Sequence, residues 1–216
     1  MRSDKETQNP STTSPKRRQI LQAAEDLFLA QGYGAVSMEA IARRADVSKA
    51  TLYAYFTGKD ALFSCIVADK GRENLLDESL FPEEEIDLRA TLLTIGLRLM
   101  RFLQRSRTLA LQRVVIAERA RFPELGRIVY RNGPARFVAR MAPWVALLGQ
   151  RGLLRPCAPE VATQHFLALV RGDLFLRGAL GMTPAPTEAE IAASVEAAVD
   201  AWLRAYQAPE SGTAAS

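Results

Sequence analysis

Apolar residues recur along nearly the whole chain at the three- and four-residue spacing that gives an α-helix one buried face. Ser14 and Pro15 precede the first stripe in the order typical of a helix start, and Gly32 ends it. No run alternates apolar and polar residues as an exposed-face strand does. The pattern therefore predicts an all-α fold of about nine helices. The first stripe comprises Ile20, Leu21, Ala24, Leu27 and Phe28.

Capping and breaking residues set the limits of the later helices. Ser37 and Ser48 are in position to cap two short helices, and residues 57–60 resemble a capping box that opens a fourth. A fifth helix is expected after Pro82, with Glu83–Glu85 at its positive end. A sixth helix is expected over residues 108–121, followed by a short helical piece that ends at 132–134 and by a helix from that point to 148. The last two helices are expected over 159–180 and from a capping box at 187–190 to 206.

Residues 38–56, MEAIARRADVSKATLYAYF, meet the demands of a helix-turn-helix motif. Two short helices that cross steeply need an apolar and then a small residue on the first helix, and these are Ile41 and Ala42. The turn position must tolerate left-handed geometry, and Asp46, although not the usual glycine, is among the few residues that do. With Leu52 buried, the side chains left to project toward a major groove are those of Lys49, Ala50, Thr51 and Tyr53.

Residues 20–33 and 38–63 resemble the TetR/AcrR family of bacterial transcription regulators, most specifically at Tyr53-x-Tyr55-Phe56-x-x-Lys59-x-x-Leu62. Residues 113–137 and 166–181 resemble AefR-like C-terminal domains. The resemblance implies a cytoplasmic bacterial homodimer that binds double-stranded DNA at a palindromic operator and is released by a small-molecule effector. Carried over residue by residue, it assigns DNA contacts to Ser37, Ser48, Lys49, Ala50, Thr51, Tyr53, Tyr55 and Lys59.

The first helix of the motif departs from that pattern. Met38 and Glu39 fall where some relatives place a base-reading threonine or arginine. Because the Glu39 carboxylate would repel phosphate, base reading by this helix is left open.

Charge and composition add few constraints. The 216 residues carry 28 basic and 24 acidic groups, a net charge of +4 that permits contact with a polyanion without requiring it. No apolar run approaches the about 18 residues that span a membrane, and the N-terminus lacks an apolar secretion signal. Cys65 and Cys157 fit neither a disulfide framework nor a metal site. A cytoplasmic protein without a cofactor, a metal or a membrane partner is therefore expected.

The same pattern predicts the domain organisation and the assembly. Residues 1–14 are expected to be a flexible arm, 15–62 the DNA-binding domain, 63–207 the effector and dimerisation domain, and 208–216 a flexible tail. The helix at 159–180 is apolar on most sides and needs cover from its own core or from a second chain. We expect this helix and the next to form the homodimer interface, the latter through Val195, Val199, Trp202 and Tyr206.

An effector cavity is expected between three of the C-terminal helices. An apolar or aromatic ligand would suit it, although a methionine and aromatic set at helical spacing also forms ordinary core. The candidate lining residues are Phe102, Phe137, Met141, Trp144, Phe166 and Val170.

Two other functions remain as alternatives. The first is a protein of the same fold that binds DNA for a structural or positioning role without an effector. The second is an all-α enzyme, which is disfavoured because His165 is the sole histidine, is expected in the core, and belongs to no catalytic constellation. Asp173 is the one conspicuous acid in its apolar helix, with Arg113 or Arg177 as possible partners.

Overall fold

The computed structural model describes residues 14–75 and 78–209, without the side chains of residues 72–75 and 78. Within these ranges it contains ten α-helices, one short 3₁₀ helix and no strand, which confirms the all-α prediction. The count exceeds nine because the short piece before Gly133 is a helix of its own. The expected arm at 1–14 and tail at 208–216 lie outside the described residues, except for Ser14 and residues 208–209.

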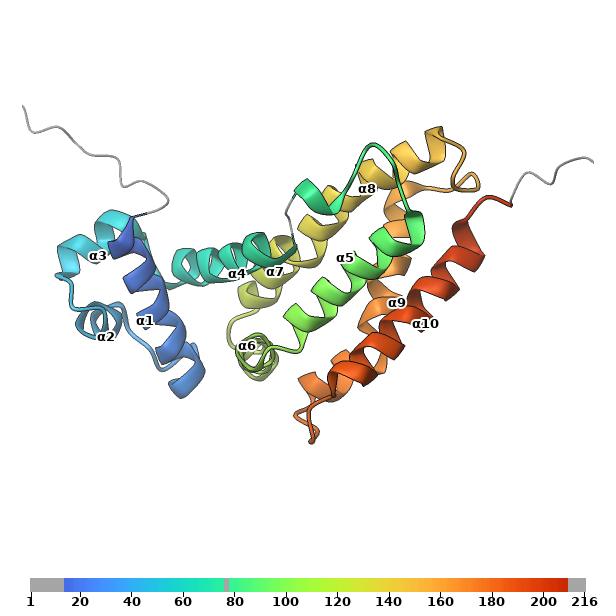
Figure 1. Cartoon of the computed structure of the whole chain (residues 1–216). Coiled ribbons are helices and arrows are strands. Elements are labelled where there is room, and N and C mark those ends of the chain that lie inside the picture. Colours follow the sequence, from blue (N-terminus) through green and yellow to red (C-terminus); the bar gives the residue numbers. More distant parts are fainter. Residues whose placement is uncertain (1–13, 76–77, 210–216) are drawn as a thin grey trace, which may run out of the picture.

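The first three helices, within residues 15–55, form a unit that we call the head, and the fourth helix connects it to the rest of the chain (Figure 1). Ser37 and Ser48 cap the second and third helices, accepting hydrogen bonds from the backbone N–H of Ala40 at 3.1 Å and of Thr51 at 3.0 Å. Asp46 adopts the left-handed conformation in the turn, with φ 49°. These features confirm the predicted helix-turn-helix. The bounds are α1 (Pro15–Gln31), α2 (Met38–Arg44), α3 (Lys49–Tyr55) and α4 (Lys59–Leu75).

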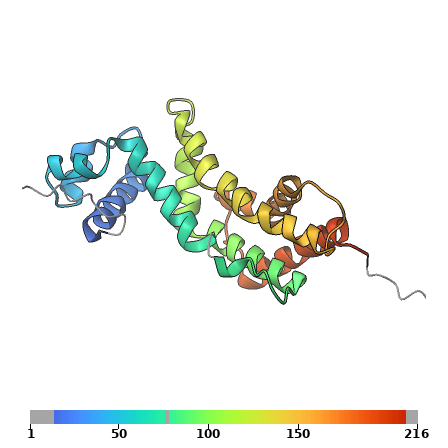
Figure 2. The same cartoon turned by 90° about the horizontal axis from the view of Figure 1, so that it is seen from above.

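The remaining helices make up the larger, C-terminal part, and the two views show an elongated molecule with the head at one end (Figures 1 and 2). The last helix opens with the predicted capping box, in which Thr187 and Glu190 exchange hydrogen bonds. The bounds are η1 (Glu78–Leu80), α5 (Leu88–Leu103), α6 (Ser106–Glu118), α7 (Glu124–Asn132), α8 (Pro134–Gln150), α9 (Pro159–Ala179) and α10 (Glu188–Tyr206).

Two local predictions are corrected. The helix expected directly after Pro82 begins only at Leu88, because Asp87 caps it by accepting the Ala90 N–H at 2.9 Å, so Glu83–Glu85 lie outside it. The helix at 159–179 is also interrupted: Gly172 has φ 44° and ψ −153°, which breaks the helical path in the middle of α9. A Cβ at Gly172 would meet only Ser194 Oγ at 3.9 Å, so the backbone conformation, and not crowding, favours glycine there.

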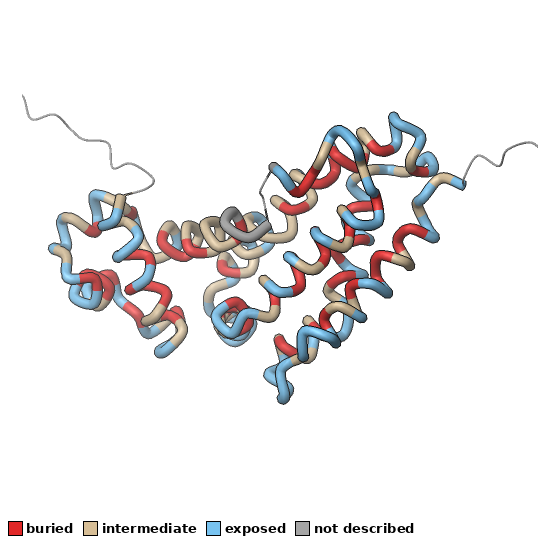
Figure 3. The backbone as a smooth tube through the Cα atoms, viewed as in Figure 1, coloured by how far each residue is buried: buried red, intermediate tan, exposed pale blue. Residues whose placement is uncertain are grey.

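Buried residues line the inner faces of the helices in two hydrophobic cores (Figure 3). The core of the head extends into the C-terminal part, because Leu111 and Val115 of α6 and Leu125 of α7 belong to it. A second contact lies at the loop after α1, where the Gly34 N–H donates to Glu118 Oε1 at 3.0 Å. The head therefore rests on α6 and α7 as well as on α4.

The last two helices pack differently from the sequence-based expectation. Val195, Val199 and Trp202 of α10 are fully buried in the core of their own chain, and Trp202 Nε1 donates to the Ala162 carbonyl at 2.8 Å. The prediction that these three residues meet a second chain is therefore wrong. His165 was expected in the core but lies exposed, with its Nδ1 within hydrogen-bonding distance of the Tyr206 hydroxyl.

Candidate DNA-reading surface and effector cavity

The exposed side of α3 carries most of the residues expected to contact DNA. Ser48, Lys49, Ala50 and Tyr53 are exposed, whereas Leu52 on the opposite side is fully buried. Thr51 is half-buried and its hydroxyl lies 2.8 Å from that of Ser48, so the cap also orients the threonine. The helix thus presents a short polar face that matches the size of a major-groove contact.

The second helix modifies that face. Glu39 pairs with Lys49 at 2.6 Å, and the hydrogen bond from Lys49 holds the pKa of the Glu39 carboxyl below its usual range. Met38 is buried at 8% exposure and so faces the core of the head. Ser37, at the start of this helix, is exposed and accepts from the Ala40 N–H. Glu39 therefore neutralises Lys49, one of the residues expected to contact DNA.

Tyr55 and Lys59 both have structural partners. The half-buried Tyr55 packs against the core of the head and has its hydroxyl 3.3 Å from Ser14 Oγ. The ammonium of Lys59 donates to the Tyr33 carbonyl at 2.9 Å and lies 4.6 Å from the centre of the Tyr33 ring. Lys59 thus holds the loop after α1 in place, in addition to any phosphate contact.

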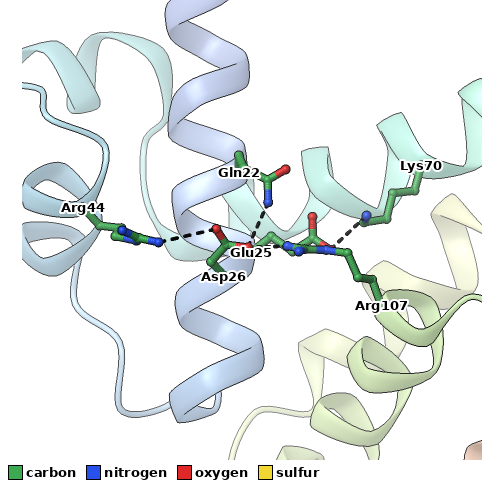
Figure 4. Close-up of polar contacts among 6 residues, drawn as sticks. All are labelled: Gln22, Glu25, Asp26, Arg44, Lys70 and Arg107. Atoms are coloured by element: carbon green, nitrogen blue, oxygen red, sulfur yellow. Dashed lines mark hydrogen bonds and ion pairs between the residues drawn. The ribbon is translucent and has the colours of Figure 1, made fainter.

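A buried carboxylate joins the head to the C-terminal part (Figure 4). Glu25 of α1 has a side chain that is only 6% exposed. Its Oε1 forms ion pairs with Nζ of Lys70 on α4, at 2.9 Å, and with Nε of Arg107 on α6, at 3.0 Å. A buried charge is stable only when it is paired, so these two cations are held beside α1. Three helices are thereby tied together at one point.

Asp26 extends this network toward the helix-turn-helix. It accepts hydrogen bonds from Gln22, at 2.9 Å, and from Arg107, and lies 4.0 Å from Arg44 of α2 (Figure 4). Desolvation raises the pKa of Asp26, but the hydrogen bonds from Arg107 and Gln22 outweigh it, so the pKa lies below its usual range. The network thus reaches from α4 and α6 through α1 to α2.

A small cavity of about 70 Å³ is lined by residues of the six helices from α4 to α9. Of the six residues expected to line an effector site, Phe102 and Phe137 line this cavity. The other four lie in the hydrophobic core of the C-terminal part and do not border it: Met141, Trp144, Phe166 and Val170. Because ligand sites usually measure about 300–1,000 Å³, this conformation is too closed for a full-sized ligand.

The cavity wall also contains polar residues that the sequence analysis missed. Lys70, Gln112, Asn132, Arg136 and Arg171 line it. The available signal was Arg171, a base in the middle of the apolar run FLALVRGDLF. The conspicuous acid of the same run, Asp173, proves instead to be 73% exposed and 3.9 Å from Arg177.

Comparison with known proteins identifies the family. Residues 20–66 match the tetR family of bacterial regulatory proteins, and residues 90–208, more than half of the chain, match the C-terminal domain of AefR-like transcriptional repressors. The chain belongs to the TetR family. This TetR-family chain is a helix-turn-helix transcriptional regulator.

Similar proteins extend over almost the whole chain. The solved structure of a TetR-family regulator of Mesorhizobium loti MAFF303099 has 32% identity and a TM-score of 0.78, with 91% of this chain and 99% of that one covered. The flavonoid-responsive regulator FrrA has 34% identity, a TM-score of 0.74 and coverages of 91% and 98%. The transcriptional regulator YvkB of Bacillus subtilis (strain 168) is 25% identical over 77% of this chain and 85% of its own.

These relatives are transcriptional regulators and not enzymes. In the described part of the chain, no helix is both long and apolar enough to cross a membrane. The described residues also contain no group of three or more His, Cys, Asp or Glu side chains that could hold a metal ion.

The lowered pKa of Asp26 makes its contribution to stability depend on pH. Stabilisation by a carboxylate of lowered pKa is present above the unfolded value of about 4 and is lost as pH falls through the folded value. We expect Asp26→Asn to lower the free energy of unfolding by about 1–2 kcal/mol at pH 7 and by less at pH 3, as measured by urea unfolding. Glu84→Gln, in the exposed loop before α5, is the control and should cost under about 0.5 kcal/mol at both pH values. An equal loss for Asp26→Asn at both pH values would contradict the assignment.

Proposed function

We propose that this TetR-family regulator is a ligand-responsive repressor that binds a palindromic operator as a homodimer and releases it when a small apolar or aromatic effector enters the cavity. The observation that carries the proposal is Lys70, which lines the cavity and also pairs with Glu25 of the head. Residues 15–62 would then read DNA, and residues 63–207 would bind the effector and form the dimer.

Lys70 gives a physical route from the cavity to DNA. A ligand that displaces the Lys70 side chain would weaken its contact with Glu25, and Arg107 shares that carboxylate oxygen. The head could then shift relative to α6 and change the spacing of the two recognition helices, which must lie about 34–36 Å apart to reach both half-sites. To change the dimer from about 99% in the DNA-binding conformation to about 99% in the conformation that cannot bind DNA, the ligand must bind the latter more tightly by about 5.5 kcal/mol.

An exposed apolar face on α9 supports the dimer. Val161 and Leu169 lie before the break at Gly172, Leu176 and Leu180 lie after it, and all four are 39–69% exposed. Alanines at 189, 193 and 197 of α10 are exposed as well and would let a second copy approach closely. Large exposed apolar side chains gathered along one element are typical of a surface that a partner covers. We therefore keep α9 and α10 as the proposed interface, through this face instead of the buried stripe.

The relatives support an aromatic effector. FrrA is flavonoid-responsive, and it resembles this chain across both the head and the C-terminal part. Phe102 and Phe137 supply aromatic walls to the cavity, which suits a planar ligand.

Mapping of genomic binding sites tests the function as a whole. A local repressor should occupy a few sites that share a palindrome, one of them close to its own gene. Many sites without a common palindrome would instead favour the structural or positioning role.

Variants of the reading face should separate affinity from specificity. Glu39→Gln frees Lys49 for phosphate, so affinity should rise on all DNA sequences and the salt slope should steepen by about one. Thr51→Ala should cost about 1–3 kcal/mol at particular operator positions and little on random DNA. Titrations of operator and random duplexes at several salt concentrations measure both effects, with Glu84→Gln, in the exposed loop before α5, as the charge-matched control. If Glu39→Gln behaves like that control, Lys49 does not contact DNA.

The dimer surface has a direct test. Leu176→Glu places a charge on the exposed face of α9 and should convert the dimer to a 23.8 kDa monomer in sedimentation experiments. Ile116→Glu is the matched control, because Ile116 is similarly exposed, at 48%, but lies on α6. A wild-type monomer at micromolar concentration, or a Leu176→Glu protein that remains dimeric, would contradict the proposed interface.

A further inference from the structure

Arg171 is a half-buried cation without a counterion among the described residues. Its Nε is enclosed and has no hydrogen-bond partner among the described residues. The guanidinium lies 4.8 Å from the centre of the Phe175 ring, a contact that gives the Nε–H no hydrogen-bond acceptor. Burial alone lowers the pKa of Arg171, yet a guanidinium keeps its proton because its ordinary pKa is far above neutral pH. The C-terminal part therefore holds a partly desolvated positive charge to which no acid among the described residues is paired.

Among the residues whose side chains the structure describes, no acid pairs with Arg171. The described residues that line the cavity include three bases, Lys70, Arg136 and Arg171, and no aspartate or glutamate. Asp173 lies two positions further along α9 but is 73% exposed and faces Arg177. Glu25 is already shared between Lys70 and Arg107. The cavity is thus positively charged and largely apolar at once.

We propose that the effector is an amphipathic anion, with an apolar or aromatic body and a carboxylate or similar acidic group that pairs with Arg171. The inference rests on the proposed function, because it names the ligand class of the same cavity. An ion pair formed in these apolar surroundings is strong, since it satisfies a cation that is already desolvated. A neutral ligand of the same shape would leave the Nε of Arg171 unpaired.

Two dyes differ by the proposed feature alone. 8-Anilinonaphthalene-1-sulfonate and N-phenyl-1-naphthylamine share their aromatic rings, but only the first carries an anionic group, and both fluoresce in apolar sites. The quantity to measure is the ratio of their dissociation constants. Arg171→Met should raise the dissociation constant of the sulfonate about 10- to 100-fold relative to that of the neutral dye. Arg171→Lys should restore part of this loss of affinity. Arg177→Met, on the same helix but outside the cavity lining, should leave the ratio unchanged. Gln112→Trp should block both dyes by filling the cavity.

The outcomes separate this inference from the proposed function. If Gln112→Trp blocks both dyes but Arg171→Met leaves the ratio unchanged, the cavity binds ligands without reading charge and the inference is overturned. If neither dye binds, or if Gln112→Trp changes nothing, the effector cavity itself is contradicted, and this inference with it. Thermal unfolding without dye tests a purely structural role. Arg171→Met should keep or raise the melting temperature, because it removes a buried unpaired charge, and a clear drop would contradict the assignment.

Discussion

A buried carboxylate is the central polar link between the two parts of this regulator. Glu25 is buried on α1, and its Oε1 forms ion pairs with Lys70 of α4 and Arg107 of α6. A charge at this depth requires its partners, so Lys70 and Arg107 cannot leave without a large cost. The position of the head relative to the C-terminal part is therefore set by electrostatics as well as by the apolar contacts of Leu111, Val115 and Leu125.

In the proposed mechanism this constraint is the switch on which a small ligand acts. Lys70 contacts the head on one side and lines the cavity on the other. The cavity in this structure is small and has three bases in its lining, and the Nε of Arg171 is unpaired among the described residues, which fits the proposed anionic effector. A ligand that enters would add negative charge beside Lys70 and compete with Glu25 for it. The proposed release of DNA follows from that competition and requires no unfolding.

Local signals in the sequence were sufficient for the motif and for most helices, but not for the start of α5 at Leu88 or the break at Gly172. Caps such as Ser37 and Ser48 and the turn at Asp46 act within a few residues, so their outcome could be predicted. The network and the cavity depend on residues that are distant in sequence, such as Arg107 and Glu25 at 82 positions apart, and no local pattern encodes that pairing. For the same reason four predicted lining residues proved to be core, since helical spacing shows which face is apolar but not where packing leaves a gap.

The most direct test of this account is a double-mutant cycle on Glu25 and Arg107, measured as free energies of unfolding in urea. The variants are Glu25→Gln, Arg107→Met and the double variant, with Lys70 kept in all of them. If the carboxylate joins the two parts as described, the two substitutions should couple by about 1–3 kcal/mol. Additive effects, with a coupling near zero, would show that the Glu25–Arg107 pair does not hold the head to α6 and would contradict the central claim.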